Sequence, residues 1–418
     1  MLRASALFIV IVISFLLASI TSGIVYYTFY YKIQVANQRL YSKLTHNLNS
    51  GIAYALYLPE SQSVVEKTID LYGEENDKVI IRSSVWGVFN MASVSVTDKN
   101  VTLSKSFLYG YAPDKESNAA ICLSNSDRGL RLSGKTSIVG TCYLPQGVVK
   151  TESVDGYLYQ GPAKLIDGEI IKSTDTEISV SSSIIKLAEG LLNFNFQASA
   201  AETEKEEDVV KDSLIHSFAE PVLYINYNDE RLRQLTYLEG NIIVFSNKHI
   251  NLNKHLKIKD AIVVAPSVRF PDGYQGTLQA ICSDSIVVES NVVLDYPSAL
   301  LLIKKNIANA NPKIQLKEKS SLKGIIFAYS KELNDFKVYV DLRKESFVMG
   351  QVYSTGSIDC KGVVHGGLIC KTILLKTNTS INENYLLNTT IDVKKRSVYY
   401  TGSNLLPAKN KKRIIKYL

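Results

Sequence analysis

The sequence has few residues of the kinds that build metal sites and redox centres. Five histidines and five cysteines occur in 418 residues, with neither a Cys-x-x-Cys pair nor a Cys/His set at metal-ligand spacing. The G-x-S-x-G, P-loop, H-E-x-x-H and G-x-G-x-x-G motifs are absent as well. We therefore assign no catalytic, cofactor-binding or metal-ligating residue from the sequence, and we expect no cofactor.

A strong excess of one charge is also lacking. Lysine and arginine number 47 against 40 aspartates and glutamates, and much of the formal net charge of +7 lies in the segment KNKKRIIKYL (409–418). No stripe of arginines interleaved with aromatic residues accompanies this segment. A local basic tail does not define a nucleic-acid-binding domain, so we expect no nucleic-acid partner.

Charge is missing altogether from one long stretch near the N-terminus. The segment ASALFIVIVISFLLASITSGIVYYTFYY (4–31) is longer than the roughly 20 residues that a helix needs to cross a bilayer. Small residues around Ser22 and Gly23 leave cleavage as a signal peptide open. Apolar and aromatic residues continue past them, however, which favours a retained anchor in membrane lipid. We expect a single-pass protein of the inner membrane whose body is exported.

The helical pattern continues beyond this span. Apolar residues recur every three or four positions in YKIQVANQRLYSKLTHNLNSGIAYALYLPE (31–60), which predicts an amphipathic helix that Pro59 ends. SQSVVEKTIDLYG (61–73) predicts a second, short helix. From Lys78 onward the period changes to two, which is typical of short strands. An acidic, alanine-rich segment at 198–213 indicates a linker or an exposed excursion.

Similar apolar phrases then recur at intervals of roughly twenty residues. They are GNIIVFS, DAIVVAP, LQAICSD, ALLLIKK, KGIIFAY, MGQVYST and GGLICKT, starting at residues 240, 260, 278, 299, 323, 349 and 366. A single repeat cannot bury its apolar side chains, whereas stacked repeats bury them together. The sequence predicts a mainly β protein with a right-handed parallel β-helix (β-solenoid), in which Val263 and Val287 face the core. A β-sandwich is the alternative.

These patterns divide the chain into five regions. We expect a transmembrane and amphipathic helix at 1–60, a first β-rich region at 61–197, the acidic linker at 198–213, the solenoid at 214–400 and the basic tail at 401–418.

Several residues are candidates for function, each with a structural alternative. Asp260, Asp272, Asp284 and Asp295 recur about every twelve residues, as general acids or calcium ligands of a polysaccharide-active enzyme would, but single aspartates at strand ends are also turn formers. His365 at a glycine corner fits a structural role better than that of a base. The 25 tyrosines suit either a glycan-binding face or strand packing.

The cysteines also leave two readings open. Cys122 with Cys142, and Cys360 with Cys370, flank glycine-bearing stretches and could form disulfide bonds in an exported protein. Alternatively, they are small buried hydrophobic residues.

The N-terminal region resembles the membrane-anchored pilin-like proteins of type IV pilus and type II secretion machines, particularly the larger minor pseudopilins. The resemblance covers about sixty residues, and MLRASALFIVIVISF lacks both the Gly-Phe junction and the early glutamate that are usual there. Residues 242–372 are similar to bacterial β-helix proteins, including the polymer-forming bactofilins. The second resemblance implies a fold and not an activity. Taken with the membrane span, we expect a structural or adhesive role with protein partners in an envelope assembly, or self-association. A surface polysaccharide-active enzyme and a membrane-held glycan-binding module are the alternatives.

Overall fold

The protein is described here from a computed structural model of the whole chain. The structure describes all residues except 1, 59–64, 72, 74–77, 99, 114–117, 175–179, 195–208, 211, 229, 305–311, 332–337, 404 and 406–410. The predicted acidic linker at 198–213 therefore lies mostly outside the described residues. The chain divides into two compact units, one of residues 1–60, 65–83 and 93–105 and the other of residues 61–64, 84–92 and 106–418.

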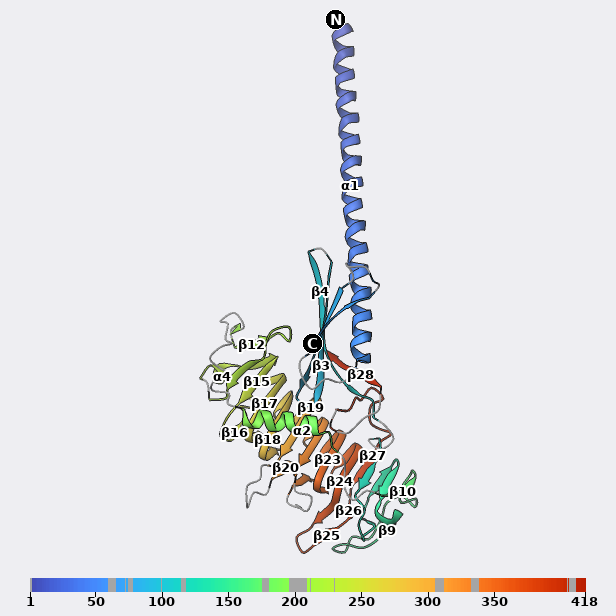
Figure 1. Cartoon of the computed structure of the whole chain (residues 1–418), viewed down its shortest axis with the longest axis vertical. Coiled ribbons are helices and arrows are strands. Elements are labelled where there is room, and N and C mark those ends of the chain that lie inside the picture. Colours follow the sequence, from blue (N-terminus) through green and yellow to red (C-terminus); the bar gives the residue numbers. More distant parts are fainter. Residues whose placement is uncertain are drawn as a thin grey trace. The chain divides into compact units, whose positions relative to one another are not determined.

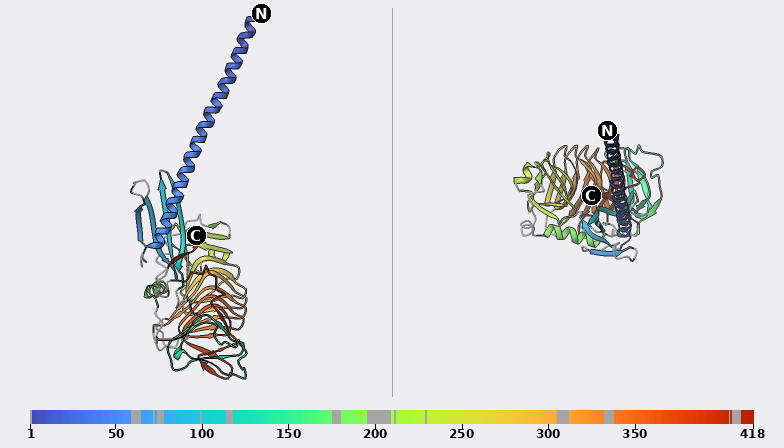
Figure 2. Two further views of the ribbon diagram at one scale, coloured as in Figure 1. Left: turned by 90° about the vertical axis from the view of Figure 1, so that its right-hand side faces the viewer. Right: turned by 90° about the horizontal axis from the view of Figure 1, so that it is seen from above.

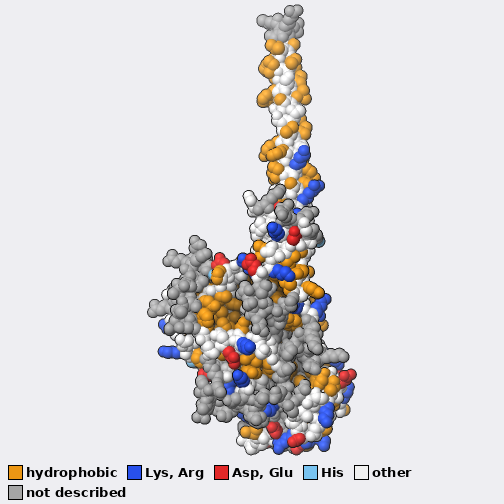
Figure 3. All heavy atoms as spheres, viewed as in Figure 1, with side chains coloured by type: hydrophobic (Ala, Val, Ile, Leu, Met, Phe, Trp, Pro, Cys, Tyr) orange, Lys and Arg blue, Asp and Glu red, His pale blue; other side chains and the backbone are white. Residues whose placement is uncertain are grey.

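The first unit contains the long N-terminal helix α1, Leu2–Tyr57. Among the described residues it is the one helix long and apolar enough to cross a membrane. Residues 6–34 are all exposed, and Figure 3 shows hydrophobic side chains along this part of α1. Its C-terminal part changes character and buries one side chain per turn, at Leu44, Leu48, Ile52 and Ala55.

A five-stranded sheet in the order β1-β2-β3-β4-β28 accompanies α1. Its strands are β1 (Val65–Asp70), β2 (Lys78–Trp86), β3 (Phe89–Asp98), β4 (Val101–Tyr111) and β28 (Lys412–Tyr417). Gly51 of α1 lies so close to this sheet that a Cβ there would meet Cγ1 of Val79 at 2.6 Å and Cγ1 of Val94 at 2.8 Å. Glycine at this position therefore allows the helix to pack directly on β2 and β3.

The predicted short helix at 61–73 is wrong, because its described part is strand β1. This strand pairs antiparallel with β2, from Val65 opposite Ser83 to Asp70 opposite Lys78. Glu66 also forms an ion pair with Arg82 at 2.7 Å. Pairing with a neighbouring strand, which a local pattern does not reveal, decides the conformation here.

The second unit is a closed core built mostly of parallel strands (Figures 1 and 2). Its strands pair in three parallel rows, which we call ladders. On the long strand at 347–360, residues 351–354 belong to the first ladder, residues 347–350 to the second and residues 357–360 to the third. Six long strands pass through more than one ladder: β17 (Lys257–Phe270), β18 (Gln275–Val288), β19 (Val293–Ile303), β21 (Ser321–Tyr329), β23 (Phe347–Cys360) and β24 (Val363–Lys376).

Shorter strands complete each ladder. The first ladder adds β13 (Leu223–Asn226), β15 (Ile242–Phe245), β5 (Ile121–Leu123), β8 (Cys142–Leu144) and β10 (Ile170–Lys172). The second adds β12 (Ser213–His216), β14 (Tyr237–Gly240), β27 (Thr390–Asp392) and β7 (Ser137–Val139). The third adds β16 (Ile250–Asn251), β20 (Lys313–Leu316) and β22 (Tyr339–Leu342).

The remaining elements lie at the margins of this core. Strands β26 (Tyr385–Leu387), β6 (Leu130–Ser133) and β9 (Val149–Thr151) form a separate parallel sheet. Short strands β11 (Val209–Val210) and β25 (Ile381–Glu383) pair antiparallel with β12 and β24. The helices are α2 (Ser182–Asn193), α4 (Glu230–Gln234) and the 3-10 turn Pro145–Gly147.

The seven recurring phrases pair with one another in the first ladder. One inward column consists of Val244, Val263, Ala280, Leu300, Ile326, Val352 and Leu368, and every member is part of the buried core. The prediction of a mainly β body behind one long apolar helix is thus confirmed. Parallel pairing does not fit the antiparallel sheets of a β-sandwich. It defines a closed parallel core, and it does not by itself establish the right-handed β-helix that we expected.

One inward residue was assigned to the wrong face. Val263 is fully buried as predicted, but Val287 is only half-buried, and its neighbours Ile286 and Val288 face the core instead. The Ile-Val-Val of residues 286–288 belongs to the third ladder and pairs with residues 268–270, whereas the Ile-Val-Val of residues 262–264 belongs to the first ladder. Treating the two phrases as equivalent therefore placed Val287, the partner of the exposed Arg269, on the wrong face.

Glycines mark the corner where the chain enters the first ladder. Gly324 and Gly350 have φ angles of +146° and +147°. A Cβ at Gly350 would lie 1.9 Å from the carbonyl oxygen of Gly324 on the neighbouring strand. The phrases KGIIFAY and MGQVYST therefore carry glycine before the apolar run because the corner leaves no room for a side chain.

Two segments distant in sequence share this core. The chain first forms β5, β7, β8 and β10, and only later winds from β12 to β27. Leu368 of β24 then pairs with Ile121 of β5, and Thr390 of β27 pairs with Ser137 of β7. We call this junction of β24 and β27 with β5 and β7 the seam.

Candidate functional site

The outward face of the first ladder is apolar and covered. Phe245, Ile281, Leu301 and Phe327 belong to a second hydrophobic cluster that includes Ile184 and Ala188 of α2 and the Trp86–Phe89 turn. Gln279 fixes this turn, because its Nε2 donates to the carbonyl of Trp86 at 3.1 Å and its Oε1 accepts from the N–H of Val88 at 2.8 Å. This face is a packing surface.

The outward face of the third ladder is polar instead. A cavity of about 620 Å³ lies over β20, β22, β23 and β24, and we call it the third-ladder pocket. Its size falls within the range of about 300–1,000 Å³ that is common for ligand sites. The side chains that matter most here are Lys313, Tyr339, Asp341, Arg343, Ser357, Asp359, Lys361 and Lys376.

Two aspartates form the floor of this pocket. Asp341 and Asp359 are direct partners on the parallel strands β22 and β23, and they are 2% and 1% exposed. Oδ2 of Asp341 accepts from Gln315 Nε2 at 2.7 Å and from Arg343 Nε at 2.8 Å. The two strands thus hold two carboxylates side by side in a nearly closed environment.

Asp359 is held in a similar way on the next strand. Its Oδ2 accepts from Lys361 Nζ at 3.0 Å, from Tyr339 OH at 3.2 Å and from the Lys376 N–H at 3.2 Å. The ammonium of Lys376 lies 3.9 Å from the centre of the Tyr339 ring. Each carboxylate is therefore anchored through one oxygen only.

The other oxygens are the unusual feature of the pocket. Oδ1 of Asp341, Oδ1 of Asp359 and Oγ of Ser357 are buried without a hydrogen-bond partner among the described residues. Native proteins rarely leave buried polar atoms in this state, since each costs about 1–3 kcal/mol. Three of these atoms lie together in this one pocket.

Burial controls the protonation of this site. It raises the pKa of Asp359 above its ordinary value, although Lys361 and the Lys376 N–H oppose the shift, and Asp341 adds to it. Burial also raises the pKa of Tyr339, with both carboxylates adding to the effect. Independently of these shifts, the pocket is lined by Asp341 and Asp359 and by four cationic side chains, Lys313, Arg343, Lys361 and Lys376.

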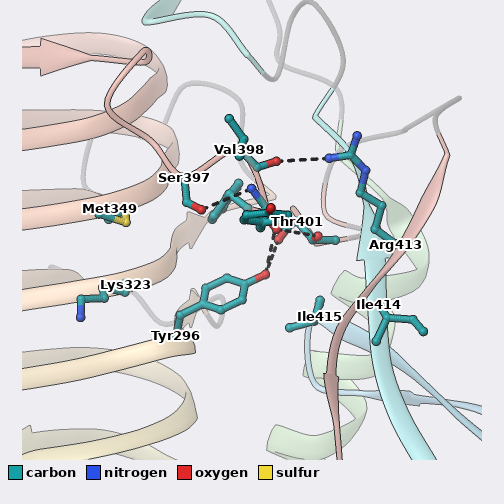
Figure 4. Close-up of a pocket in the computed structure, with 11 residues that line it drawn as sticks. Tyr296, Lys323, Met349, Ser397, Val398, Thr401, Arg413, Ile414 and Ile415 are labelled. Atoms are coloured by element: carbon teal, nitrogen blue, oxygen red, sulfur yellow. Dashed lines mark hydrogen bonds between the residues drawn. The ribbon is translucent and has the colours of Figure 1, made fainter.

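A second cavity, of about 810 Å³, lies beside the second ladder and is shown in Figure 4. Tyr296 points into it, and its hydroxyl donates to the Thr401 carbonyl at 3.0 Å. Burial raises the pKa of Tyr296 to about 12. Arg413 donates to the Val398 carbonyl at 3.4 Å. The hydroxyl of Tyr296 and the guanidinium of Arg413 are therefore paired, and none of the described residues that line this cavity has a buried polar side-chain atom without a partner.

The structure does not bring the four predicted aspartates together. Asp260 pairs with Lys416, and Asp295 pairs with Lys323 at 2.9 Å. Asp272 accepts from Asn291 at 2.9 Å, and Asp284 accepts from Ser283 at 2.7 Å. A spacing of about twelve residues is shorter than one repeat, so successive members fall at different points around the core. The hypothesis of an acidic site from these residues is wrong.

The other candidates have structural surroundings. His365 contacts the ring of Phe347 edge to face at 4.9 Å, and burial lowers its pKa. All five cysteines are thiols, so the alternative of unpaired cysteines holds for both Cys122 with Cys142 and Cys360 with Cys370. Four of them are buried, and burial raises the pKa of Cys142 to about 12. Several tyrosines, such as Tyr274 and Tyr400, pack in the interior.

Sequence reasoning missed the pair that does come together. The phrases YVDLR (339–343) and SIDCK (357–361) share an aspartate between two apolar residues, followed by a cation. Their spacing equals the register shift between β22 and β23, because Tyr339 pairs with Ser357 and Asp341 with Asp359. Comparing polar positions at the repeat length would have found them.

Comparisons with known proteins add little to this description. No protein-family model matches the chain, and no curated protein matches it. The crystal structure of the competence-associated pilin ComZ from Thermus thermophilus is similar at 8% identity, covering 86% of this chain and 88% of that one, with a TM-score of 0.23. An ice-binding protein from an Antarctic Flavobacteriaceae bacterium is similar at 13% identity, covering 68% of this chain but 48% of that one, with a TM-score of 0.17.

Proposed function

We propose that the chain is a single-span, membrane-held envelope protein with a structural or adhesive role in a pilus-like or secretion assembly. Its body is exported from the inner membrane, and the parallel core is a right-handed β-solenoid. Three parallel ladders with inward columns of aliphatic residues support the solenoid, because this pairing is what stacked repeats produce.

The continuity of α1 carries the proposed assembly role. One unbroken helix runs from the exposed, apolar N-terminal part to the part that packs on β2 and β3 through Leu44, Leu48 and Gly51. A simple tether needs no unbroken helix between its span and the strands that follow. A subunit that packs through its helix does need one, because the same helix must then contact its neighbours and its own strands β2 and β3.

The small residues of the span suit such packing. Ser14, Ala18, Ser22 and Gly23 lie within the exposed apolar part of α1, and small side chains allow helices to approach closely in lipid. Replacing residues 7–30 by polyleucine keeps a span but removes these small positions. We expect this chimera to insert in the membrane and to lose co-purification with its envelope partners after cross-linking.

A matched variant distinguishes a span that packs against partner helices from a span that is only a tether. Exchanging only lipid-compatible large residues, Leu16→Ile and Leu17→Ile, should leave the cross-linked assembly intact. A polyleucine chimera that assembles like the parent would show that the span is only a tether.

Export of the body is tested separately. A reporter enzyme that is active only outside the cytoplasm, fused after Leu418, should be active. Activity of a cytoplasmic reporter at that position would contradict export.

A further inference from the structure

The unsatisfied floor of the third-ladder pocket calls for hydrogen-bond donors. Oδ1 of Asp341, Oδ1 of Asp359 and Oγ of Ser357 are buried and unpaired among the described residues. Carboxylate oxygens only accept hydrogen bonds when ionised, so a group that completes them must carry N–H or O–H. Ser357 is 0% exposed, so its hydroxyl is not satisfied by bulk solvent.

The rim of the same pocket calls for negative charge. Four cationic side chains, Lys313, Arg343, Lys361 and Lys376, line the pocket against two carboxylates. Lys361 and Arg343 are already paired with the floor, whereas Lys313 and Lys376 are exposed. A free metal cation would meet this positive rim, and no group of three His, Cys, Asp or Glu side chains in the described part of the chain could hold one. The ligand is therefore anionic.

Access to the floor is possible without rebuilding the core. The Arg343 side chain is 45% exposed and that of Lys361 is 23% exposed, so both long side chains border solvent above the aspartates. Small movements of these side chains would open Oδ1 to a ligand hydroxyl. The aspartates themselves are fixed by the backbone of β22 and β23.

We propose that the third-ladder pocket binds an acidic polysaccharide of the uronate type, whose hydroxyls donate to Asp341, Asp359 and Ser357 while its carboxylates contact Lys313 and Lys376. Each uronate residue carries both groups that the pocket requires. Duplex DNA offers negative charge but no free hydroxyl along its backbone, so it leaves the floor unsatisfied. This inference does not depend on the proposed assembly role, since a tethered protein could bind the same ligand.

The test uses the full chain in detergent micelles with polygalacturonate as the probe, followed by light scattering or fluorescence titration. Fully methyl-esterified polygalacturonate has the same backbone without charge, and a 30-base-pair DNA duplex has charge without hydroxyls. We expect binding of the acidic polymer that weakens at high salt, with at least about tenfold weaker binding of the other two.

Three variants distinguish the pocket from general surface attraction. Lys313→Glu should weaken binding about tenfold or more, whereas Lys257→Glu, an equally exposed lysine on the second ladder, should change it less than about twofold. Ser357→Ala removes an oxygen that has no hydrogen-bond partner among the described residues, so folding should be unaffected while binding weakens about fivefold.

Several results would overturn the proposal. They are no binding, equal binding of the esterified polymer, tighter binding of DNA, or equal losses in Lys313→Glu and Lys257→Glu. A Ser357→Ala variant that folds and binds like the parent would also contradict it, because the buried hydroxyl then serves no ligand.

Discussion

The outward faces of the first and third ladders are made by neighbouring segments of the same core, yet their chemistry is opposite. Phe327 in the first ladder is fully buried beneath the second hydrophobic cluster. Gln315, on the preceding strand in the third ladder, binds the carboxylate of Asp341. A parallel strand that is buried on both faces contributes only to the packing of the core. A strand whose outward face is polar can in addition contribute side chains to a binding site.

This difference is already visible in the local sequence. ALLLI (299–303) and GIIFA (324–328) are continuous apolar runs, which is typical of strands covered on both faces. KIQLK (313–317), YVDLR (339–343) and SIDCK (357–361) alternate apolar and polar residues. The change from continuous to alternating pattern within one repeat therefore tells which outward face is covered.

The largest loss of stability is expected for a charge placed in the interior of the core that all three ladders enclose. Val263→Asp places an unpaired carboxylate in the core and should cost several kcal/mol, enough to prevent folding of the full chain. Val287→Asp changes an outward, half-buried residue and should cost about 1 kcal/mol or less. The yield of folded protein in detergent micelles measures the first effect, and thermal unfolding followed by circular dichroism measures the second. Equal losses would mean that the assigned faces are wrong.

A smaller effect should separate the covered face from the open one. Phe327→Ala removes a ring that stacks on Tyr353 at 4.9 Å and should destabilise by about 3–5 kcal/mol. Lys313→Ala, on the exposed face, should change stability by no more than about 0.5 kcal/mol. The same unfolding measurement applies. A mild Phe327→Ala variant would indicate that the outward cluster adds little to the core.

The cover of the first ladder can also be strengthened. Gly190 lies in α2, is exposed, and has nothing within 4 Å of the place where a Cβ would stand. Gly190→Ala should therefore raise the unfolding free energy by about 0.5–1 kcal/mol through helix propensity. Gly350→Ala is the opposite control, because its Cβ would collide with a carbonyl oxygen. A neutral Gly190→Ala variant would show that α2 unfolds independently of the core.

The smallest expected effect is a change in pH dependence. The folded-state pKa of Asp359 is raised, so the folded protein binds more protons than the unfolded chain between the two pKa values. The contribution of Asp359 to stability is then greatest at low pH and falls as pH rises through that window. Asp359→Asn should remove this decline, so the stability of the parent relative to the variant should decrease between pH 4 and pH 7. A relative increase over this range would contradict the assigned shift.

The sequence predicted the parts of the molecule that repeat and missed those that depend on pairing between distant segments. The charge-free span and the seven phrases follow from composition and from the burial of stacked repeats. Strand β1 was taken for a helix because its partner β2 is invisible to local periodicity. The face of Val287 was misassigned because its Ile-Val-Val phrase was equated with one from a different ladder. Asp341 and Asp359 went unrecognised because the aspartates were compared at twelve residues instead of one repeat.

The seam imposes an order on the formation of the core. Leu368 completes the pairing of Ile121, so strands that emerge early must wait for a segment near the end of the chain. Pairing at such long range is slow, and unpaired strand edges are prone to aggregate meanwhile. If the body crosses the membrane from its N-terminal end, β5 and β7 reach the far side with one edge of each strand still unpaired. These edges then need shielding until translocation is nearly finished, so the supply of chaperones on that side should limit the yield of this protein more than its final stability does.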